Sequence, residues 1–82
     1  MKEHEIKTIV FGLLKNIAPD TEPEKLKPED NIKETLNIDS FDFLKLIVGI
    51  DEKFGIATPE EDYGKIMKLG ELVSYIVLKM KK

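Results

Sequence analysis

Asp39 and Ser40 are the residues whose types and position most clearly suggest a chemical role, because they stand where a polar stretch gives way to a dense apolar one. Aspartate is a preferred N-cap residue, since its carboxylate accepts hydrogen bonds from the first free backbone N–H groups of a helix. Asp42 adds negative charge in the same first turn, where the helix dipole favours it. Ser40 then takes the first helical position, and we expect its hydroxyl to be open to solvent and to a modifying enzyme. Taken alone, an Asp-Ser pair is common and predicts only a capped helix.

Catalysis by the chain's own side chains has little support in the sequence. A serine nucleophile requires a nearby base, and His4 is the only imidazole in the 82 residues. It lies in a polar N-terminal turn, where we expect ordinary surface. The chain has no cysteine, and its acids lack the spacing of a calcium-binding loop. The sequence therefore predicts neither an enzyme nor a metal protein.

Charge is distributed unevenly along the chain. Residues 20–62 hold thirteen acids and five lysines, a net charge of −8, whereas the whole chain has a net charge of −3. All thirteen basic residues are lysines, so the planar fork of arginine is not available for phosphates or guanine edges. An acidic middle repels nucleic acid and steers partners that have a basic face. We expect protein partners of that kind and no nucleic acid; a merely solvated acidic surface is the simpler alternative.

The length predicts one small domain over residues 1–82, with a modest core and no disulfide to support it. The absence of cysteine fits a reducing cytoplasm. No N-terminal apolar run resembles a signal peptide, and no stretch is long enough to cross a membrane. We therefore expect a cytoplasmic protein without a membrane partner. We also expect a monomer.

Helical periodicity predicts three long helices. Apolar residues recur at helical spacing over residues 3–17 and again over about 69–80. Residues 40–54 are apolar over most of the helix circumference, which predicts a central helix, an exposed recognition patch or both. Gly55 stands where a C-terminal cap belongs. Gly49 lies on the narrow polar strip of that helix, where side-chain packing gives no reason for a glycine.

The connections between these helices contain further signals. Residues 18–39 form a long first connection, which we expect to pack across the bundle with a possible helical turn. Its apolar contacts are predicted at Leu26, Ile32, Leu36 and Ile38. Thr58–Glu61 has the pattern of a capping box, with Pro59 at the first position of a short helix that continues to Ile66. With no convincing strand, the fold class is all-α.

The serine motif and three further segments resemble acyl carrier proteins, whose phosphopantetheine attachment motif is usually Gly-x-Asp-Ser-Leu. Here the motif is Asn37-Ile38-Asp39-Ser40-Phe41. The same register continues without a gap through Phe54-Gly55, Thr58-Pro59-Glu60-Glu61-Asp62 and Lys65-Ile66, and then from Leu69 to Ile76. The resemblance therefore covers the chain from about Leu13 to Ile76.

This resemblance implies a four-helix bundle of acyl carrier type, with three longer helices, one short helix and a long first loop. It also implies that Ser40 receives 4′-phosphopantetheine from a coenzyme A-dependent transferase. The thiol at the end of that arm would hold acyl groups as thioesters, for delivery to enzymes of fatty-acid, lipid or polyketide-type biosynthesis. Because the thiol belongs to the cofactor, a chain without cysteine can perform this function.

The resemblance further assigns roles to individual residues. Asp39 would cap the helix and contact the transferase. Contacts with partner enzymes are implied for Phe41, Asp42, Leu44, Val48 and Glu52. An acyl-binding pocket in the core is implied for Phe54, Tyr63, Ile66, Leu72 and Ile76.

Five positions depart from the family pattern. Asn37 replaces the usual glycine, which is tolerable because asparagine is the next-best residue for a left-handed turn. Phe41 replaces leucine and enlarges the apolar patch, Lys45 replaces a common acid, and Thr58 replaces an apolar residue. Tyr63 replaces a small residue of the acyl cavity, so its ring either narrows the cavity or turns outward. Together these departures favour a specialised carrier. If the ring of Tyr63 narrows the cavity, the cargo is expected to be a short, polar or otherwise unusual acyl group.

Two alternatives remain open from the sequence. One is an aminoacyl or peptidyl carrier, which uses the same arm for another cargo. The other is a small helical interaction module whose serine is never modified.

Overall fold

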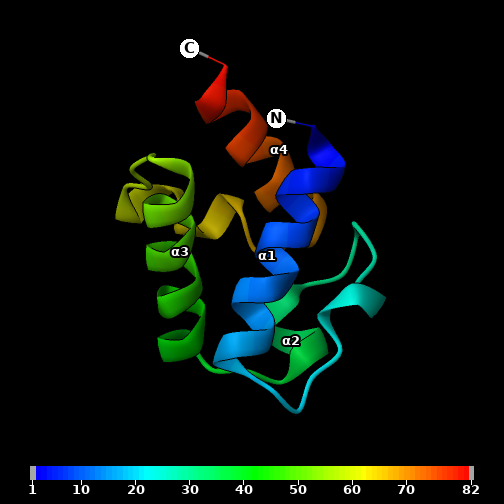
Figure 1. Ribbon diagram of the computed structural model, residues 1–82. Coiled ribbons are helices and arrows are strands. Elements are labelled where there is room, and N and C mark those ends of the chain that lie inside the picture. Colours follow the sequence, from blue (N-terminus) through cyan, green and yellow to red (C-terminus); the bar gives the residue numbers. More distant parts are fainter. Residues whose placement is uncertain (1, 82) are drawn as a thin grey trace.

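The three long helices have the predicted boundaries. The computed structural model describes residues 2–81, and its long helices are α1 (Glu3–Ile17), α3 (Ser40–Phe54) and α4 (Leu69–Met80). Figure 1 shows α1 lying beside α3, with α4 packed against the upper part of α1. Within the described residues there is no strand, only an isolated backbone bridge. The all-α prediction is therefore confirmed.

Local hydrogen bonds define where these helices begin and end. Glu5 and Glu71 each accept a hydrogen bond from the backbone N–H three residues earlier, at 2.8 and 3.2 Å, which closes the first turns of α1 and α4. Gly55 adopts the left-handed conformation with φ of 66° at the end of α3, as the capping prediction required.

A single cluster of buried apolar side chains holds the helices together, and every long helix contributes to it. Its members are Ile6, Val10, Leu14, Leu26, Ile32, Phe43, Leu46, Ile47, Ile50, Phe54, Ile66, Leu69, Leu72, Val73 and Ile76. The broad apolar arc of α3 serves two purposes, because five of its residues are buried and three others are exposed. This helix is therefore both a central helix and an exposed apolar surface.

The long first connection packs against the bundle as predicted. It contains a 3-10 turn, η1 (Pro23–Lys25), and a short helix, α2 (Ile32–Leu36). Ile32 is fully buried, and its backbone N–H donates to the carbonyl of Met67 at 2.9 Å. The side chain of Asn31 accepts from the N–H of Glu34 and so caps α2. The bond to Met67 and a backbone bridge between Asn31 and Lys68 place the start of α2 beside the start of α4.

The capping box predicted at Thr58–Glu61 is wrong. The segment is a 3-10 helix, η2 (Glu60–Lys65), and Pro59 precedes it in an extended conformation. The Thr58 hydroxyl donates instead to Asp51 Oδ1 at 2.7 Å, and its N–H donates to Oδ2 of the same carboxylate at 3.1 Å. The short helix therefore ends before Ile66 and is of 3-10 type, while the only short α-helix within residues 2–81 is α2.

Gly49 has a packing role that the sequence did not indicate. A Cβ atom at this position would lie 3.1 Å from Cδ2 of Leu13 on α1. The position is half-buried and faces the neighbouring helix at the edge of the polar strip. The glycine thus allows α1 and α3 to approach closely, at a cost of about 1 kcal/mol in helix propensity relative to alanine.

Candidate functional site

Ser40 is the first residue of α3, and its side chain is exposed. Oδ1 of Asp39 accepts a hydrogen bond from the backbone N–H of Asp42 at 2.8 Å, so the predicted cap is confirmed. Just before this cap, Asn37 adopts the left-handed conformation with φ of 56°, the geometry that glycine or asparagine accommodates best. The serine hydroxyl is therefore presented to solvent at a capped helix start.

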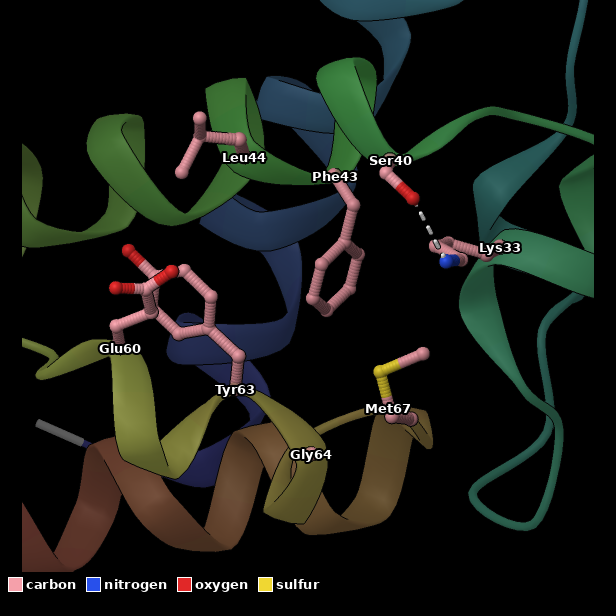
Figure 2. A pocket seen from close by; sticks show the side chains of 8 residues that line it. All are labelled: Lys33, Ser40, Phe43, Leu44, Glu60, Tyr63, Gly64 and Met67. Atoms are coloured by element: carbon pink, nitrogen blue, oxygen red, sulfur yellow. Dashed lines mark hydrogen bonds between the residues drawn. The ribbon is translucent and has the colours of Figure 1, made fainter.

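Lys33 reaches the serine from α2. Its Nζ atom donates a hydrogen bond to Ser40 Oγ at 3.1 Å, across seven residues of sequence (Figure 2). The carbonyl of Lys33 accepts the backbone N–H groups of Asn37 and Ile38, which ties the end of α2 to the turn that leads into α3. Sequence reasoning did not find Lys33, because its position beside Ser40 depends on how the long connection folds back.

A groove of about 470 Å³ opens beside the serine, between α3 and η2. In Figure 2, Ser40 and Lys33 lie at one side of it, while Tyr63 and Glu60 lie at the other. The lining residues are Lys33, Ser40, Phe43, Leu44, Glu60, Tyr63, Gly64 and Met67. Its volume lies within the roughly 300–1,000 Å³ of small-molecule sites. The apolar side chains of Phe43, Leu44 and Met67 and the ring of Tyr63 give it an apolar lining, and Lys33, Ser40 and Glu60 add polar groups.

Of the residues expected in an acyl pocket, only Tyr63 lines this groove. Its side chain is half-buried and points from η2 toward α3 (Figure 2), so the ring has not turned fully into solvent. The other four, Phe54, Ile66, Leu72 and Ile76, are at most 8% exposed and belong to the closed core. The structure therefore separates the predicted set into one groove residue and four core residues.

The residues expected to contact partners are together on α3. Phe41 is 75% exposed, Leu44 40% and Val48 50%, and their spacing of three and four places them on one helix face. Glu52 is exposed and Asp42 half-exposed on the same helix. This apolar surface with adjacent acids begins next to Ser40 and runs along α3.

Two hydrogen-bonded pairs hold the η2 wall of the groove in place. The first is the pair of bonds from Thr58 to Asp51 of α3. The second joins η2 to α4, where the Tyr75 hydroxyl donates to Asp62 Oδ2 at 2.8 Å. Lys65 Nζ lies 3.5 Å from Oδ1 of the same carboxylate.

The hydrogen bond between Tyr75 and Asp62 shifts the pKa of both side chains. Burial, followed by the hydrogen bond to Asp62, raises the pKa of Tyr75 to about 12. The same hydrogen bond is the main cause of a lowered pKa for Asp62, with Lys65 contributing. Sequence analysis missed this pair, since no local pattern connects two residues thirteen positions apart.

Within residues 2–81, no group of three or more histidine, cysteine, aspartate or glutamate side chains could hold a metal ion. His4 is exposed in the first turn of α1, as expected. None of the described helices is both long enough and apolar enough to span a membrane.

Several known proteins resemble this chain in sequence. A family model described as "Phosphopantetheine attachment site" matches residues 6–76. The chain is 41% identical to the acyl carrier protein of Wolinella succinogenes over 54 residues, which cover 66% of this chain and 71% of that protein. It is 33% identical to the meromycolate extension acyl carrier protein of Mycolicibacterium aurum over 70 residues, which cover 83% and 72% of the two chains.

A solved structure extends the similarity to the fold. An acyl carrier protein from Enterococcus faecalis superposes with a TM-score of 0.73 at 30% identity, covering 96% of this chain and 99% of that one. That similarity confirms the helical bundle of acyl carrier type. Because the family match includes the serine motif and most of every long helix, the chain belongs to the acyl carrier protein family, whose members bear covalent 4′-phosphopantetheine.

Proposed function

We propose that Ser40 is the attachment point of the phosphopantetheine arm, and that the chain delivers acyl groups from this site without catalysing a reaction itself. The exposed hydroxyl at the capped start of α3 carries this proposal. The surroundings fit the arm, since an anion is favoured at a helix N-terminus and Lys33 lies 3.1 Å from the oxygen that would be esterified.

The chain's residues bind and position, while the arm supplies the reactive group. The bound arm provides a terminal thiol that holds acyl groups as thioesters. Asp39 keeps the first turn of α3 ordered beneath the serine, and the groove offers apolar surface next to it. A transferase that brings coenzyme A finds Ser40 unobstructed, since its side chain is exposed.

Partner enzymes would dock on α3. The exposed side chains of Phe41, Leu44 and Val48 offer apolar contacts, and Asp42 and Glu52 offer charges for a basic face. The partners would be a phosphopantetheinyl transferase and acyl-loading or acyl-transferring enzymes. Electrostatic attraction of this kind mainly raises the association rate. A monomeric state and a cytoplasmic location remain part of the proposal.

The cargo would be short, polar or otherwise unusual. Tyr63 occupies part of the groove beside Ser40, and the core beneath is closed. Since close-packed interiors do not expand freely, a long saturated chain would find little room. The pathway would be of fatty-acid or polyketide type; M. aurum's meromycolate extension carrier is a relative named for a specialised role.

Intact-mass measurement tests the attachment site. The protein is co-expressed with a promiscuous phosphopantetheinyl transferase, alongside Ser40→Ala and the matched control Ser74→Ala. Ser74 is the only other serine of the chain and lies exposed in α4, well inside the helix. We expect the wild type and Ser74→Ala to gain the mass of the arm and Ser40→Ala to gain nothing.

Two results would count against the proposal. A gain of mass in Ser40→Ala would place the arm elsewhere, and no gain in the wild type would support an unmodified interaction module. Loading the holo protein with fatty acyl or aminoacyl groups by partner enzymes then separates an acyl carrier from an aminoacyl carrier.

A further inference from the structure

Lys33 is the cation of the serine site. Its Nζ atom donates to Ser40 Oγ at 3.1 Å, since an ammonium group has donors only and the hydroxyl oxygen accepts. The ion pairs found within residues 2–81 join Lys25 to Glu22 and Lys65 to Asp62, so Lys33 is directed at the serine and not at a carboxylate.

The position of Lys33 follows from the packing of α2. The preceding residue, Ile32, is fully buried, and its N–H donates to the carbonyl of Met67. The carbonyl of Lys33 accepts the N–H groups of Asn37 and Ile38 in the turn before α3. The lysine backbone is thus held on both sides, and only its flexible side chain must move to adapt to a group on Ser40.

Without this lysine, the nearest charged side chains on α3 would both repel a phosphodiester on Ser40. Asp39 and Asp42, in the same helical turn, are both acidic and would repel its negative charge. The helix N-terminus attracts an anion, and Lys33 adds a full positive charge at hydrogen-bonding distance from the ester oxygen. Hydrogen bonds between an ammonium group and an anionic oxygen are shorter and stronger than neutral ones.

We infer that Lys33 is a positioning residue that binds the phosphate of the arm and holds the arm's first atoms over the mouth of the groove. This inference rests on the proposed attachment at Ser40. Lys33 lines the groove together with Ser40, so a phosphate bound by both is kept on the groove side of α3. The lysine thereby favours the groove over open solvent as the direction in which the arm leaves the helix.

The test uses holo protein prepared with coenzyme A and a transferase, with loading verified by intact mass. Phosphorus-31 NMR follows the phosphodiester from about 0.02 M to about 0.5 M salt, where screening weakens an exposed ion pair. Nuclear Overhauser effects between the Lys33 side chain and the arm's methylene group next to the phosphate report direct contact. Two variants test the lysine: Lys33→Met keeps an apolar stem, and Lys33→Arg keeps the charge. The matched control is Lys45→Met, which removes another lysine, one that is exposed on α3.

In the wild type we expect the contact signals and a salt-dependent phosphorus shift. Lys33→Met should lose most of the salt-dependent change, Lys33→Arg should retain it, and Lys45→Met should behave as the wild type. The inference is overturned if the wild type has no contact between Lys33 and the arm, or if Lys33→Met responds to salt as the wild type does. An unloaded Ser40 refutes the proposed function as well, whereas a loaded Ser40 without the lysine contact refutes only this inference.

Discussion

The length of acyl chain that the carrier shelters should depend on Tyr63. Its half-buried ring lines the groove of about 470 Å³ beside Ser40, and the core side chains beneath are at most 8% exposed. A saturated chain that extends from the serine along the groove toward η2 therefore meets the ring of Tyr63 (Figure 2). Replacing Tyr63 by alanine removes that obstacle and connects more apolar space to the groove.

The expected effect can be calculated per methylene group. Each fully buried methylene contributes about 0.8 kcal/mol, and 1 kcal/mol shifts the melting temperature of a domain of this size by about 4–8 °C. Each sheltered methylene should thus raise the melting temperature by at most about 3–6 °C. In the wild type we expect this rise to stop after the first few methylene groups, whereas in Tyr63→Ala it should continue to longer chains.

The assay loads holo protein with saturated acyl chains of increasing length and records melting temperature and the methyl NMR shifts of Leu72 and Ile76. Tyr63→Ala alone should cost about 2 kcal/mol, less than truncation of a fully buried ring, so the slopes with chain length are compared. Phe11→Ala is the control, since Phe11 is a half-buried aromatic residue on α1 that does not line the groove. Equal, steady slopes in the wild type and Tyr63→Ala would refute the reasoning.

Three further predictions concern packing, docking and pH. Gly49→Ala should stabilise the fold less than Gly12→Ala in urea unfolding. Both variants gain about 1 kcal/mol of helix propensity, but only the new Cβ at position 49 is crowded, since it lies 3.1 Å from a leucine methyl group, whereas a Cβ at position 12 has no neighbour within 4 Å. Glu52→Lys should slow association with a basic acyl-handling enzyme in stopped-flow measurements, most strongly at low salt, because this exposed acid contributes to steering. Tyr75→Phe should flatten the pH dependence of unfolding free energy at both extremes. Because the pKa of Asp62 is lowered in the folded protein, this carboxylate stabilises the fold above its ordinary pKa of 3.8. That stability is lost as the pH falls through the pKa of the folded state. Because the pKa of Tyr75 is raised in the folded protein, its protonated hydroxyl stabilises the fold below the ordinary pKa of 10.0. That stability is lost as the pH rises through the folded-state pKa of about 12.

Each of these predictions has a contradicting outcome. Equal stabilisation by the two alanine variants would mean that α1 and α3 are not in close contact at position 49. An association rate indifferent to both salt and Glu52→Lys would argue against electrostatic docking. An unchanged pH profile in Tyr75→Phe would show that the bond to Asp62 contributes nothing to stability.

Local patterns were sufficient for the long helices and for the serine. The boundaries of α1, α3 and α4 follow from apolar residues at helical spacing and from capping groups such as Asp39 and Gly55. Each of these signals acts within a turn or two of one helix, so a single segment of sequence contains it completely. The exposure of Ser40 follows from the same cap.

Short segments were less predictable, because partners elsewhere in the chain decide their conformation. Thr58 has the pattern of a helix cap, but the carboxylate of Asp51 takes both its N–H and its hydroxyl. The 3-10 helix that follows is further bound to Tyr75 through Asp62. The helix propensity of a few residues cannot outweigh such contacts, which is why η2 differs from the α-helix that its sequence suggested.

The sequence by itself thus determined the helical class, the three long helices and the capped serine, since these depend on neighbours within a few residues. Only the tertiary structure decided that Lys33 meets Ser40, that Gly49 faces Leu13, and that Tyr63 lines the groove while Phe54 and the other predicted pocket residues close the core. These contacts depend on how α2 folds back and how the helices approach one another. Such geometry arises from the packing of the whole core and is not encoded in any one segment.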